Sequence, residues 1–184
     1  MKLNLIVAIC ESRGIGNKGK LPWRLKSEME YFSEITTACD KPGKINAVLM
    51  GRKTWDSIPK KFKPLPRRLN VILSHSLKNE DTDNVLYAQS FPQALEKLST
   101  MREKLNKLWV IGGLMIYKEA LEHPSCDKVY LTKIYKNFEC DTFLPELPLH
   151  FDVTKDDAVP QGMQEENGIQ YEVLVYQNQN QNKV

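Results

Sequence analysis

The chain has 184 residues, of which 41% are apolar, and its 26 basic and 23 acidic side chains give a formal net charge of +3. This length predicts about one domain with a sizeable core. So small a charge does not require a nucleic-acid partner, although a local basic patch could still bind a small anionic ligand.

The four cysteines and three histidines form no metal or redox motif. Because no C-x-x-C pair is present, neither a zinc cage nor a dithiol motif can be assigned, and we expect no metal. Free thiols indicate a reducing, cytoplasmic compartment. The apolar stretch 1–10 is too short and interrupted for a signal peptide, and no run approaches the ~20 residues that cross a bilayer. We therefore expect no membrane association.

Short apolar runs alternate with helical patterns along the chain. The predicted strands cover residues 3–10, 45–50, 69–73, 85–88, 108–111, 129–134 and 169–176. The predicted helices cover residues 25–37, 52–57, 92–102 and 114–122. This order predicts an α/β fold with three layers, in which helices flank a central, mostly parallel twisted sheet of about eight strands. Ligands are expected at the carboxyl ends of the strands.

The C-terminal region departs from this pattern. Residues 169–176 alternate between apolar and polar side chains, which predicts an antiparallel C-terminal edge strand as part of a hairpin. The Gln- and Asn-rich residues that follow have nothing to bury. We therefore predict a single domain over residues 1–176 and a polar, flexible tail over residues 177–184.

A glycine-rich loop follows the first predicted strand. Its glycines Gly14, Gly16 and Gly19 match the G-x-G-x-x-G motif of dinucleotide-binding Rossmann folds. The residues after Gly19 lead to Leu21-Pro22-Trp23 instead of a helix interior, so the motif lacks its required context. An exposed loop that covers a site is the alternative interpretation.

The first predicted helix carries an inward-facing acid. Ser27 and Glu30 have the spacing of a capping box. At about 100° per residue, Glu28 falls within an apolar stripe. The stripe consists of Leu25, Met29, Phe32 and Ile35. A carboxylate in an apolar wall needs donors or a raised pKa, which makes Glu28 a candidate functional residue, but a partly hydrated first-turn acid is an equally good interpretation.

Two strand-to-helix junctions are suited to bind a ligand. At the first, Gly51 precedes Arg52 and Lys53, and free N–H groups with two cations favour a phosphate. At the second, the pair Gly112-Gly113 allows close approach of a ligand, although a tight turn explains it nearly as well. Near the third strand, Arg68 offers a planar fork for a carboxylate, with an ordinary surface arginine as the alternative.

Taken in chain order, these segments resemble the dihydrofolate reductase family. The matching motifs are Gly14-Ile15-Gly16, Leu21-Pro22-Trp23 with Glu28, residues 50–55 with Ser57-Ile58-Pro59, Ile111-Gly112-Gly113 with Tyr117, and residues 141–145. The resemblance extends from about Leu3 to Tyr176. Several loop lengths are similar to those of the eukaryotic-type, monofunctional enzymes.

The resemblance implies an enzyme that reduces 7,8-dihydrofolate to tetrahydrofolate with NADPH as cofactor, by hydride transfer to C6 and protonation at N5. Such an enzyme supplies one-carbon metabolism and thymidylate synthesis. The family's own fold is implied in place of a Rossmann fold. The implied ligands are dihydrofolate, folate and antifolates such as methotrexate, and a monomer that needs neither nucleic acid nor membrane is expected.

The resemblance also assigns residues to roles. Glu28 matches the active-site acid, Thr132 the threonine that orients it, Trp23 the holder of an ordered water, and Leu21 part of the loop that closes over the nicotinamide. Substrate contacts are implied for Ile6, Val7, Ala8, Glu28, Met29, Phe32, Ser57, Ile58, Leu65, Arg68, Ile111 and Thr132. Cofactor contacts are implied for Ala8, Ile15, Gly16, Gly19, Gly51, Arg52, Lys53, Thr54, Leu73, Ser74, His75, Ile111, Gly112, Gly113, Leu114, Met115 and Tyr117.

Two positions depart from the family pattern. Met29 stands where many relatives carry an aromatic residue or leucine. His75 replaces an arginine common in vertebrates, so preference for NADPH rests more on Arg52.

Three different functions stay open beside dihydrofolate reduction. The basic segments 60–63 and 67–68 allow a nucleic-acid-binding domain. Another NADPH-dependent reductase of the same fold, such as the pyrimidine reductase of riboflavin synthesis, is the second. An inactive homologue is the third.

Overall fold

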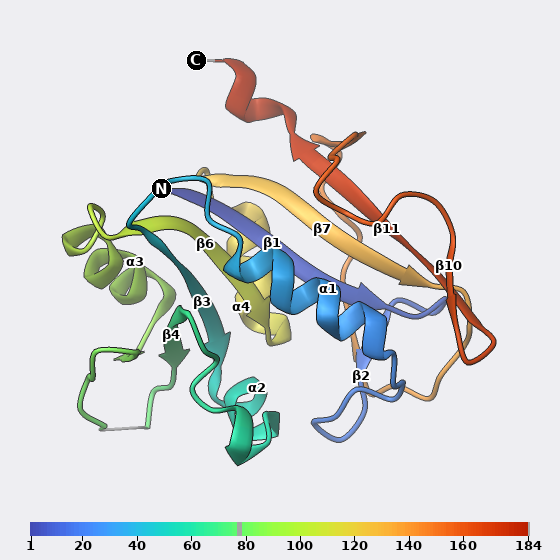
Figure 1. The fold of residues 1–184 in the computed structure, drawn as a ribbon, viewed down its shortest axis with the longest axis horizontal. Coiled ribbons are helices and arrows are strands. Elements are labelled where there is room, and N and C mark those ends of the chain that lie inside the picture. The colour runs from blue at the N-terminus through green and yellow to red at the C-terminus, as the bar shows by residue number, and fades with distance from the viewer. Residues whose placement is uncertain (77–78, 184) are drawn as a thin grey trace.

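The computed structural model describes residues 1–76 and 79–183 and has one large twisted sheet at its centre (Figure 1). The sheet strands are β1 (Lys2–Ile9), β3 (Ile45–Gly51), β4 (Arg68–Leu73), β5 (Val85–Ala88), β6 (Leu105–Gly112), β7 (Cys126–Ile134), β9 (Phe151–Thr154), β10 (Gln164–Glu166) and β11 (Ile169–Asn178). The helices are α1 (Lys26–Thr37), α2 (Arg52–Ser57), α3 (Phe91–Thr100) and α4 (Leu114–Glu122), with 3₁₀ turns η1 (Lys60–Phe62) and η2 (Gln179–Lys183).

Within the described residues, the strand order is β10-β11-β7-β1-β6-β3-β4-β5, and β9 also pairs with β11. The six strands from β7 to β5 run parallel to their neighbours. Strand β11 is antiparallel to β7, and β9 and β10 are antiparallel to β11. The predicted mostly parallel sheet with an antiparallel C-terminal edge is therefore confirmed.

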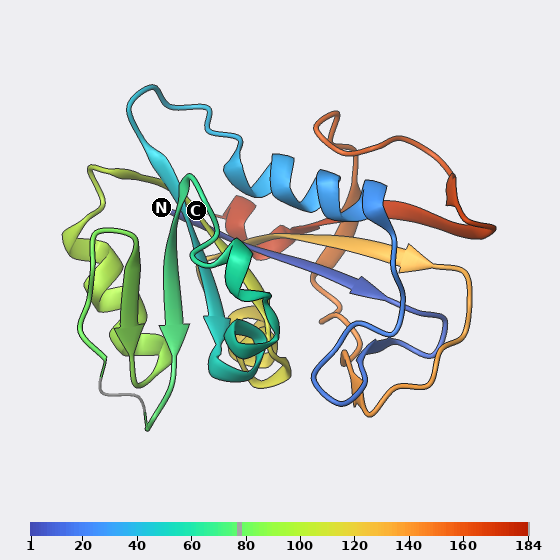
Figure 2. The ribbon, with the colours of Figure 1, turned by 60° about the horizontal axis from the view of Figure 1, so that its bottom comes forward.

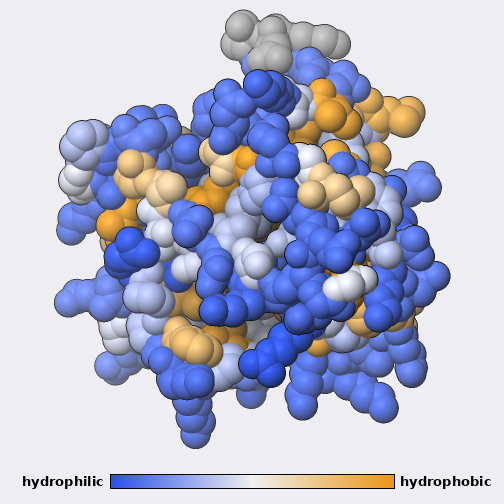
Figure 3. Space-filling view, turned by 45° about the vertical axis from the view of Figure 1, so that its right-hand side comes forward, coloured by the Kyte–Doolittle hydropathy of each residue, from blue (hydrophilic) through white to orange (hydrophobic). Residues whose placement is uncertain are grey.

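Helices cover both faces of the sheet, as Figure 2 shows, with α1 on one face and α3 and α4 on the other. Tyr31 and Ile35 of α1 pack on one core, and Phe91 and Leu98 of α3 pack in another together with helix α4. The parallel strands carry near-continuous buried runs because both faces are covered. On the face in Figure 3, apolar atoms reach the surface only as separate patches among hydrophilic side chains.

The elements agree with the sequence-based boundaries within three residues, except for the shortest strands. Strands β2 (Gly14–Gly16) and β8 (Thr142–Phe143) form a separate two-stranded sheet that was not predicted. Strand β9 was likewise not predicted, whereas β10 and β11 form the predicted antiparallel hairpin. None of the described helices is long and apolar enough to cross a bilayer.

The predicted capping box at the start of α1 is wrong. The N-cap residue is Leu25, which supplies no side-chain hydrogen bond, and Ser27 lies inside the helix. The carboxylate of Glu166 in β10 takes the capping role instead. It accepts hydrogen bonds from the backbone N–H groups of Lys26 (2.6 Å) and Ser27 (2.7 Å) and from the Ser27 hydroxyl. A distant strand therefore satisfies two of the free N–H groups at the start of this helix.

The buried stripe of α1 is also rotated relative to the prediction. Glu28, Tyr31 and Ile35 are buried, whereas Met29 is 47% exposed and Phe32 is only partly buried. Glu28 is inward as expected, but Tyr31, three residues further along the helix, replaces Met29 beside it. Met29 and Phe32 therefore lie at the margin of the stripe.

The chain beyond Tyr176 continues the last strand. Residues Gln177 and Asn178, which were predicted to lie in the tail, pair with β9. Asn178 is buried and its side-chain amide donates to the carbonyl of Cys126 (2.8 Å). The 3₁₀ turn η2 follows, and residue 184 lies outside the described residues. Strand β11 therefore ends two residues later than the predicted strand, and the amide of Asn178 can be buried there because it is hydrogen-bonded.

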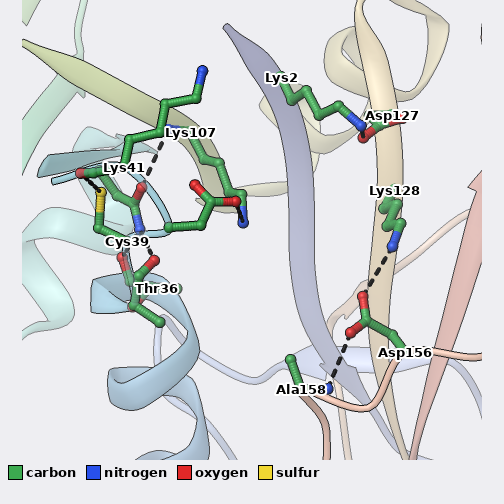
Figure 4. A network of polar contacts seen from close by, with 12 residues as sticks. Lys2, Thr36, Cys39, Lys41, Lys107, Asp127, Lys128, Asp156 and Ala158 are labelled. Atoms are coloured by element: carbon green, nitrogen blue, oxygen red, sulfur yellow. Dashed lines mark hydrogen bonds and ion pairs between the residues drawn. The ribbon is translucent and has the colours of Figure 1, made fainter. Parts of the chain in front are cut away.

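At the amino ends of the central strands, ion pairs join neighbouring elements (Figure 4). The pairs are Lys2 with Asp127 (2.9 Å), Lys107 with Asp40 (3.2 Å) and Lys128 with Asp156 (2.9 Å). These residues line a cavity of about 300 Å³ between α1 and the sheet. The cavity lies near the C-terminal end of α1, away from the ligand-binding carboxyl ends of the strands that topology predicts.

Candidate active site

The buried carboxylate of Glu28 is the chemical centre of the site. Helix α1 holds it against the sheet, where it is 6% exposed and accepts a hydrogen bond from the Thr132 hydroxyl at 2.9 Å. Thr132 is itself 1% exposed and pairs with Ala8 across β1 and β7. Burial raises the pKa of Glu28, and the hydrogen bond from Thr132 only partly opposes it. Glu28 therefore keeps its proton to a higher pH than an exposed glutamate.

Two buried aromatic residues, one just before α1 and one within it, carry unpartnered polar atoms. The indole N–H of Trp23 and the hydroxyl of Tyr31 are buried, and neither has a hydrogen-bond partner among the described residues. The Trp23 ring meets the edge of Phe138 with centroids 5.6 Å apart. Burial and the charge of Glu28 raise the pKa of Tyr31. Sequence reasoning missed Tyr31, although its i+3 spacing from Glu28 placed both on one helix face.

Half-buried apolar side chains form a wall beside the acid. They pack against the core on the α1 face that contains Ile6, and the predicted members are Phe32, Ile58, Leu65 and Ile111. Leu21 is 50% exposed and Met29 is 47% exposed, so their apolar surface is open to a ligand. Ala8 is partly buried with Trp23, and Ser57 is exposed. Apolar surface next to a buried acid suits a flat ligand with a polar edge.

Val7 does not belong to this wall. Successive side chains of a strand point to opposite faces, so Val7 faces away from Ile6 and Ala8. It packs in the core on the α3 and α4 face, with Tyr117 among its neighbours. The Val7 side chain therefore points away from the wall, and the predicted substrate contact of Val7 would be made by its backbone.

Arg68 is buried at the far end of the apolar wall. Arg68 is 4% exposed, and its guanidinium donates hydrogen bonds to the Thr36 hydroxyl (2.7 Å) and the Pro66 carbonyl (3.0 Å). Among the described residues, no carboxylate lies within ion-pair distance of it. Burial and the neighbouring Arg67 lower the pKa of Arg68 to about 10. A buried cation without an acidic partner is suited to bind an anionic ligand group.

The two glycine junctions lie side by side at the carboxyl ends of β3 and β6. Met50 pairs with Gly112 across these strands, so α2 and α4 begin next to each other. The peptide bond between Gly112 and Gly113 is cis. A Cβ at Gly112 would lie 2.9 Å from the Thr54 hydroxyl oxygen, so this position needs glycine. Two adjacent helix starts with free N–H groups can bind the phosphates of one ligand.

Cations and polar groups surround these junctions. Arg52 and Lys53 are exposed at the start of α2, and the Arg52 guanidinium donates to the Ser76 hydroxyl (2.9 Å). Ser74 and the exposed His75 follow strand β4, which ends at the partly buried Leu73. Arg52, which also pairs with Asp56 (3.5 Å), and Lys53 would place positive charge beside the helix starts, as a phosphorylated dinucleotide requires.

Residues of helix α4 differ in their access to this region. Met115 is 66% exposed and Leu114 is partly buried at the first turn. Tyr117 is buried, and its hydroxyl donates to the carbonyl of Ile6 at 2.8 Å. This bond joins α4 to β1 beneath the site. Tyr117 therefore holds the backbone of a strand whose other face carries Ile6.

The glycine-rich loop does not form a Rossmann site. Gly14 and Gly16 form strand β2 with the partly buried Ile15 between them, and Gly19 is an exposed turn residue. No helix opens at Gly19, because α1 begins only at Lys26. The loop instead leads to the exposed Leu21 and to the buried Trp23, which packs with Ala8.

Comparisons with known proteins agree with this arrangement. A family model described as "Dihydrofolate reductase" matches residues 2–178. The dihydrofolate reductase of Aedes albopictus is 44% identical over 180 residues, covering 96% of this chain and 97% of the relative. That of Sus scrofa is 41% identical over 183 residues, covering 97% and 98%. The structure of Schistosoma mansoni dihydrofolate reductase has a TM-score of 0.85 and 36% identity, covering 97% of this chain and 98% of that one.

Proposed function

This chain belongs to the dihydrofolate reductase family and reduces dihydrofolate, and we propose that NADPH supplies the hydride for C6 of the pterin while N5 receives a proton. The buried Glu28–Thr132 pair is the observation that carries the proposal. The pair gives the site one titratable acid, Glu28 on α1, whose position is fixed by Thr132 on β7. The relatives' names set aside a pyrimidine reductase and a nucleic-acid-binding domain.

Glu28 binds the pterin and assists protonation of N5. Burial raises the pKa of Glu28, so its protonated form persists to a higher pH than in an exposed glutamate, which favours a role as general acid. Thr132 acts as a positioning residue: its hydroxyl donates a hydrogen bond that fixes the Glu28 carboxylate, and it acts on the substrate only through Glu28. The unpartnered indole N–H of Trp23 is a donor for a water that relays the proton.

The apolar wall and Arg68 bind the rest of the substrate. Phe32, Ile58, Leu65 and Ile111 would contact the pterin and benzoyl rings, and Met29 and Leu21 would be covered on binding. Arg68 would pair with the α-carboxylate of the glutamyl tail, which supplies the acidic partner it lacks. Antifolates such as methotrexate carry the same chemical groups, so we expect them to bind here.

The glycine junctions fit a phosphorylated dinucleotide. Because a side chain at Gly112 would clash with Thr54, only backbone is present just before α4, where a ligand can approach it closely. Arg52 and Lys53 lie at the start of the neighbouring helix α2. We assign Arg52, with Ser74 and His75, to the phosphate that distinguishes NADPH from NADH. Ile15, Gly16 and Leu21 would exclude water from the nicotinamide. All four cysteines are free thiols, which supports a cytoplasmic enzyme, and we propose that it acts as a monomer.

The experiment is a comparison of kcat/KM with NADPH and with NADH at saturating dihydrofolate. We expect wild-type enzyme to prefer NADPH, and Arg52→Ala to reduce that preference by about tenfold or more, because it removes one charge-assisted hydrogen bond. Lys118→Ala, an exposed lysine on the outer part of α4, is the matched control and keeps the ratio. An unchanged ratio in Arg52→Ala would refute the assignment.

A further inference from the structure

Two cysteines far apart in sequence meet beside the active-site loop. Cys10 follows strand β1 and is buried, and Cys140 precedes strand β8 and is partly exposed. Their sulfur atoms are 3.9 Å apart, which is van der Waals contact between two thiols. The pair has no sequence signature, because 130 residues separate the two positions. Cys39 is exposed and its thiol donates to the carbonyl of Lys41, so it is the matched single thiol.

The small β2–β8 sheet holds the two cysteines together. The backbone N–H of Cys10 donates to the carbonyl of Gly14 (3.0 Å), and that of Asp141 donates to the carbonyl of Gly16 (3.0 Å). A Cβ at Gly14 would lie 2.3 Å from the sulfur of Cys140. Glycine at position 14 is therefore what lets Cys140 approach Cys10.

The two thiols differ in how readily they ionise. Burial opposes ionisation of Cys10, but hydrogen bonds from the Ser12 hydroxyl (3.2 Å) and from nearby backbone groups outweigh it and lower its pKa. Burial and the neighbouring Cys10 raise the pKa of Cys140 to about 11. The more readily formed thiolate is thus the inner one, and the thiol open to solvent is the outer one.

We propose that Cys10 and Cys140 form an oxidisable dithiol, a modification site for low-molecular-weight disulfides such as glutathione disulfide. The Cys140 sulfur, after losing its proton, attacks glutathione disulfide, forms a mixed disulfide and releases one glutathione thiolate. The Cys10 thiolate then attacks the Cys140 sulfur, forms the protein disulfide and releases the second glutathione thiolate. The two protons lost by the cysteines end on the two glutathiones, so two thiols are oxidised and one disulfide is reduced.

The disulfide would restrain the loop that leads to the site. Its formation brings the sulfurs from 3.9 Å to about 2.05 Å and links the end of β1 covalently to the segment before β8. The residues between Cys10 and Leu21 then have less freedom to open and close. This consequence rests on the proposed role of Ile15, Gly16 and Leu21 over the nicotinamide, whereas the bond itself does not.

The test uses a Cys39→Ala variant, reduced and then incubated with glutathione disulfide. Peptide mapping is expected to find Cys10 linked to Cys140. We expect kcat for dihydrofolate to fall about fivefold or more, within the usual range of coupling between sites, and dithiothreitol to restore it. Cys39→Ala/Cys140→Ser is the control, and its kcat is expected to be the same before and after incubation.

A map in which Cys140 carries only glutathione and no Cys10–Cys140 peptide is found would overturn the dithiol. The linked peptide with kcat and KM unchanged would overturn the restraint of the loop. Peptide mapping needs no turnover, and the reduced variant is assayed first, so failure of the dithiol is distinguishable from failure of the proposed NADPH-dependent activity.

Discussion

At the scale of single residues, the site contains an acid and a base that are both buried against their preference. Burial raises the pKa of Glu28, which therefore favours its neutral form. Burial lowers the pKa of Arg68 to about 10, yet this guanidinium still carries its charge at neutral pH. Glu28 has a hydroxyl partner, whereas the charge of Arg68 has none among the described carboxylates. The two residues therefore fit a ligand with two different ends: a group that accepts a proton at Glu28 and an anionic group at Arg68.

Replacing Arg68 should separate binding from turnover. Arg68→Leu is expected to raise the KM for dihydrofolate about 10- to 100-fold with a smaller effect on kcat, because a hydrogen bond to a charged group is worth about 1.5–3 kcal/mol. A pteridine substrate without the glutamyl tail should show no such change. Arg67→Leu, an exposed neighbour, is the control. The role fails if the KM for dihydrofolate stays at the wild-type value in a folded variant.

At the scale of elements, the start of α1 decides where the acid is placed. Glu28 lies in the first turn of this helix, and the turn is capped by Glu166 from β10. The sequence indicates the helix and its inward acid through the apolar stripe. It does not indicate the cap, because Glu166 lies about 140 residues away and only the paired β10 and β11 bring it there. A local capping box was the wrong prediction for that reason.

Removing this cap should weaken the fold in a pH-dependent way. Glu166→Ala is expected to lower the melting temperature at pH 7 by a few degrees. Hydrogen bonds from Ser27 and Lys26 hold the pKa of Glu166 below its usual value, so its stabilising effect is present above the unfolded pKa and is lost as pH falls through the folded one. The difference between variant and wild type should therefore shrink in acid.

Glu165→Ala is the control for the cap, because this neighbouring carboxylate is exposed and its side-chain contact is with Gln170 on the same hairpin. It should melt like the wild type. An equal loss of stability in the two variants, or a Glu166→Ala effect that does not depend on pH, would contradict the capping role.

At the scale of the whole molecule, the two edges of the sheet formed by the strand ends differ: the carboxyl ends carry the candidate site, and the amino ends carry ion pairs. The carboxyl ends of β3 and β6 open into the glycine junctions, and ion pairs join elements at the amino ends of β1 and β7. Buried apolar runs predicted the sheet, its order of elements and the helix boundaries within a few residues. Contacts across the fold, such as the β2–β8 sheet and the Cys10–Cys140 pair, were not predictable because their segments are too short to carry a pattern.

The C-terminal boundary can be tested by truncation. A chain ending at Asn178 is expected to keep nearly all of its free energy of unfolding, whereas one ending at Tyr176 should lose about 2–3 kcal/mol. The shorter chain loses the buried amide of Asn178 and the bonds from Gln177 to Asp127. Urea titration of both chains measures the difference. Equal stability would mean that the domain ends at Tyr176 after all.

The central claim is that Glu28 supplies the proton-holding group of dihydrofolate reduction, and the pH profile of kcat for wild type and Glu28→Gln tests it most directly. The wild-type rate should fall as pH rises through the raised pKa, because the acid form is then lost. The glutamine in Glu28→Gln has the size and shape of the glutamate side chain but cannot give up a proton. We therefore expect its kcat to be lower by about 100-fold or more, and not to fall over the pH range in which the wild-type rate falls. Full turnover with the wild-type pH profile would contradict the account.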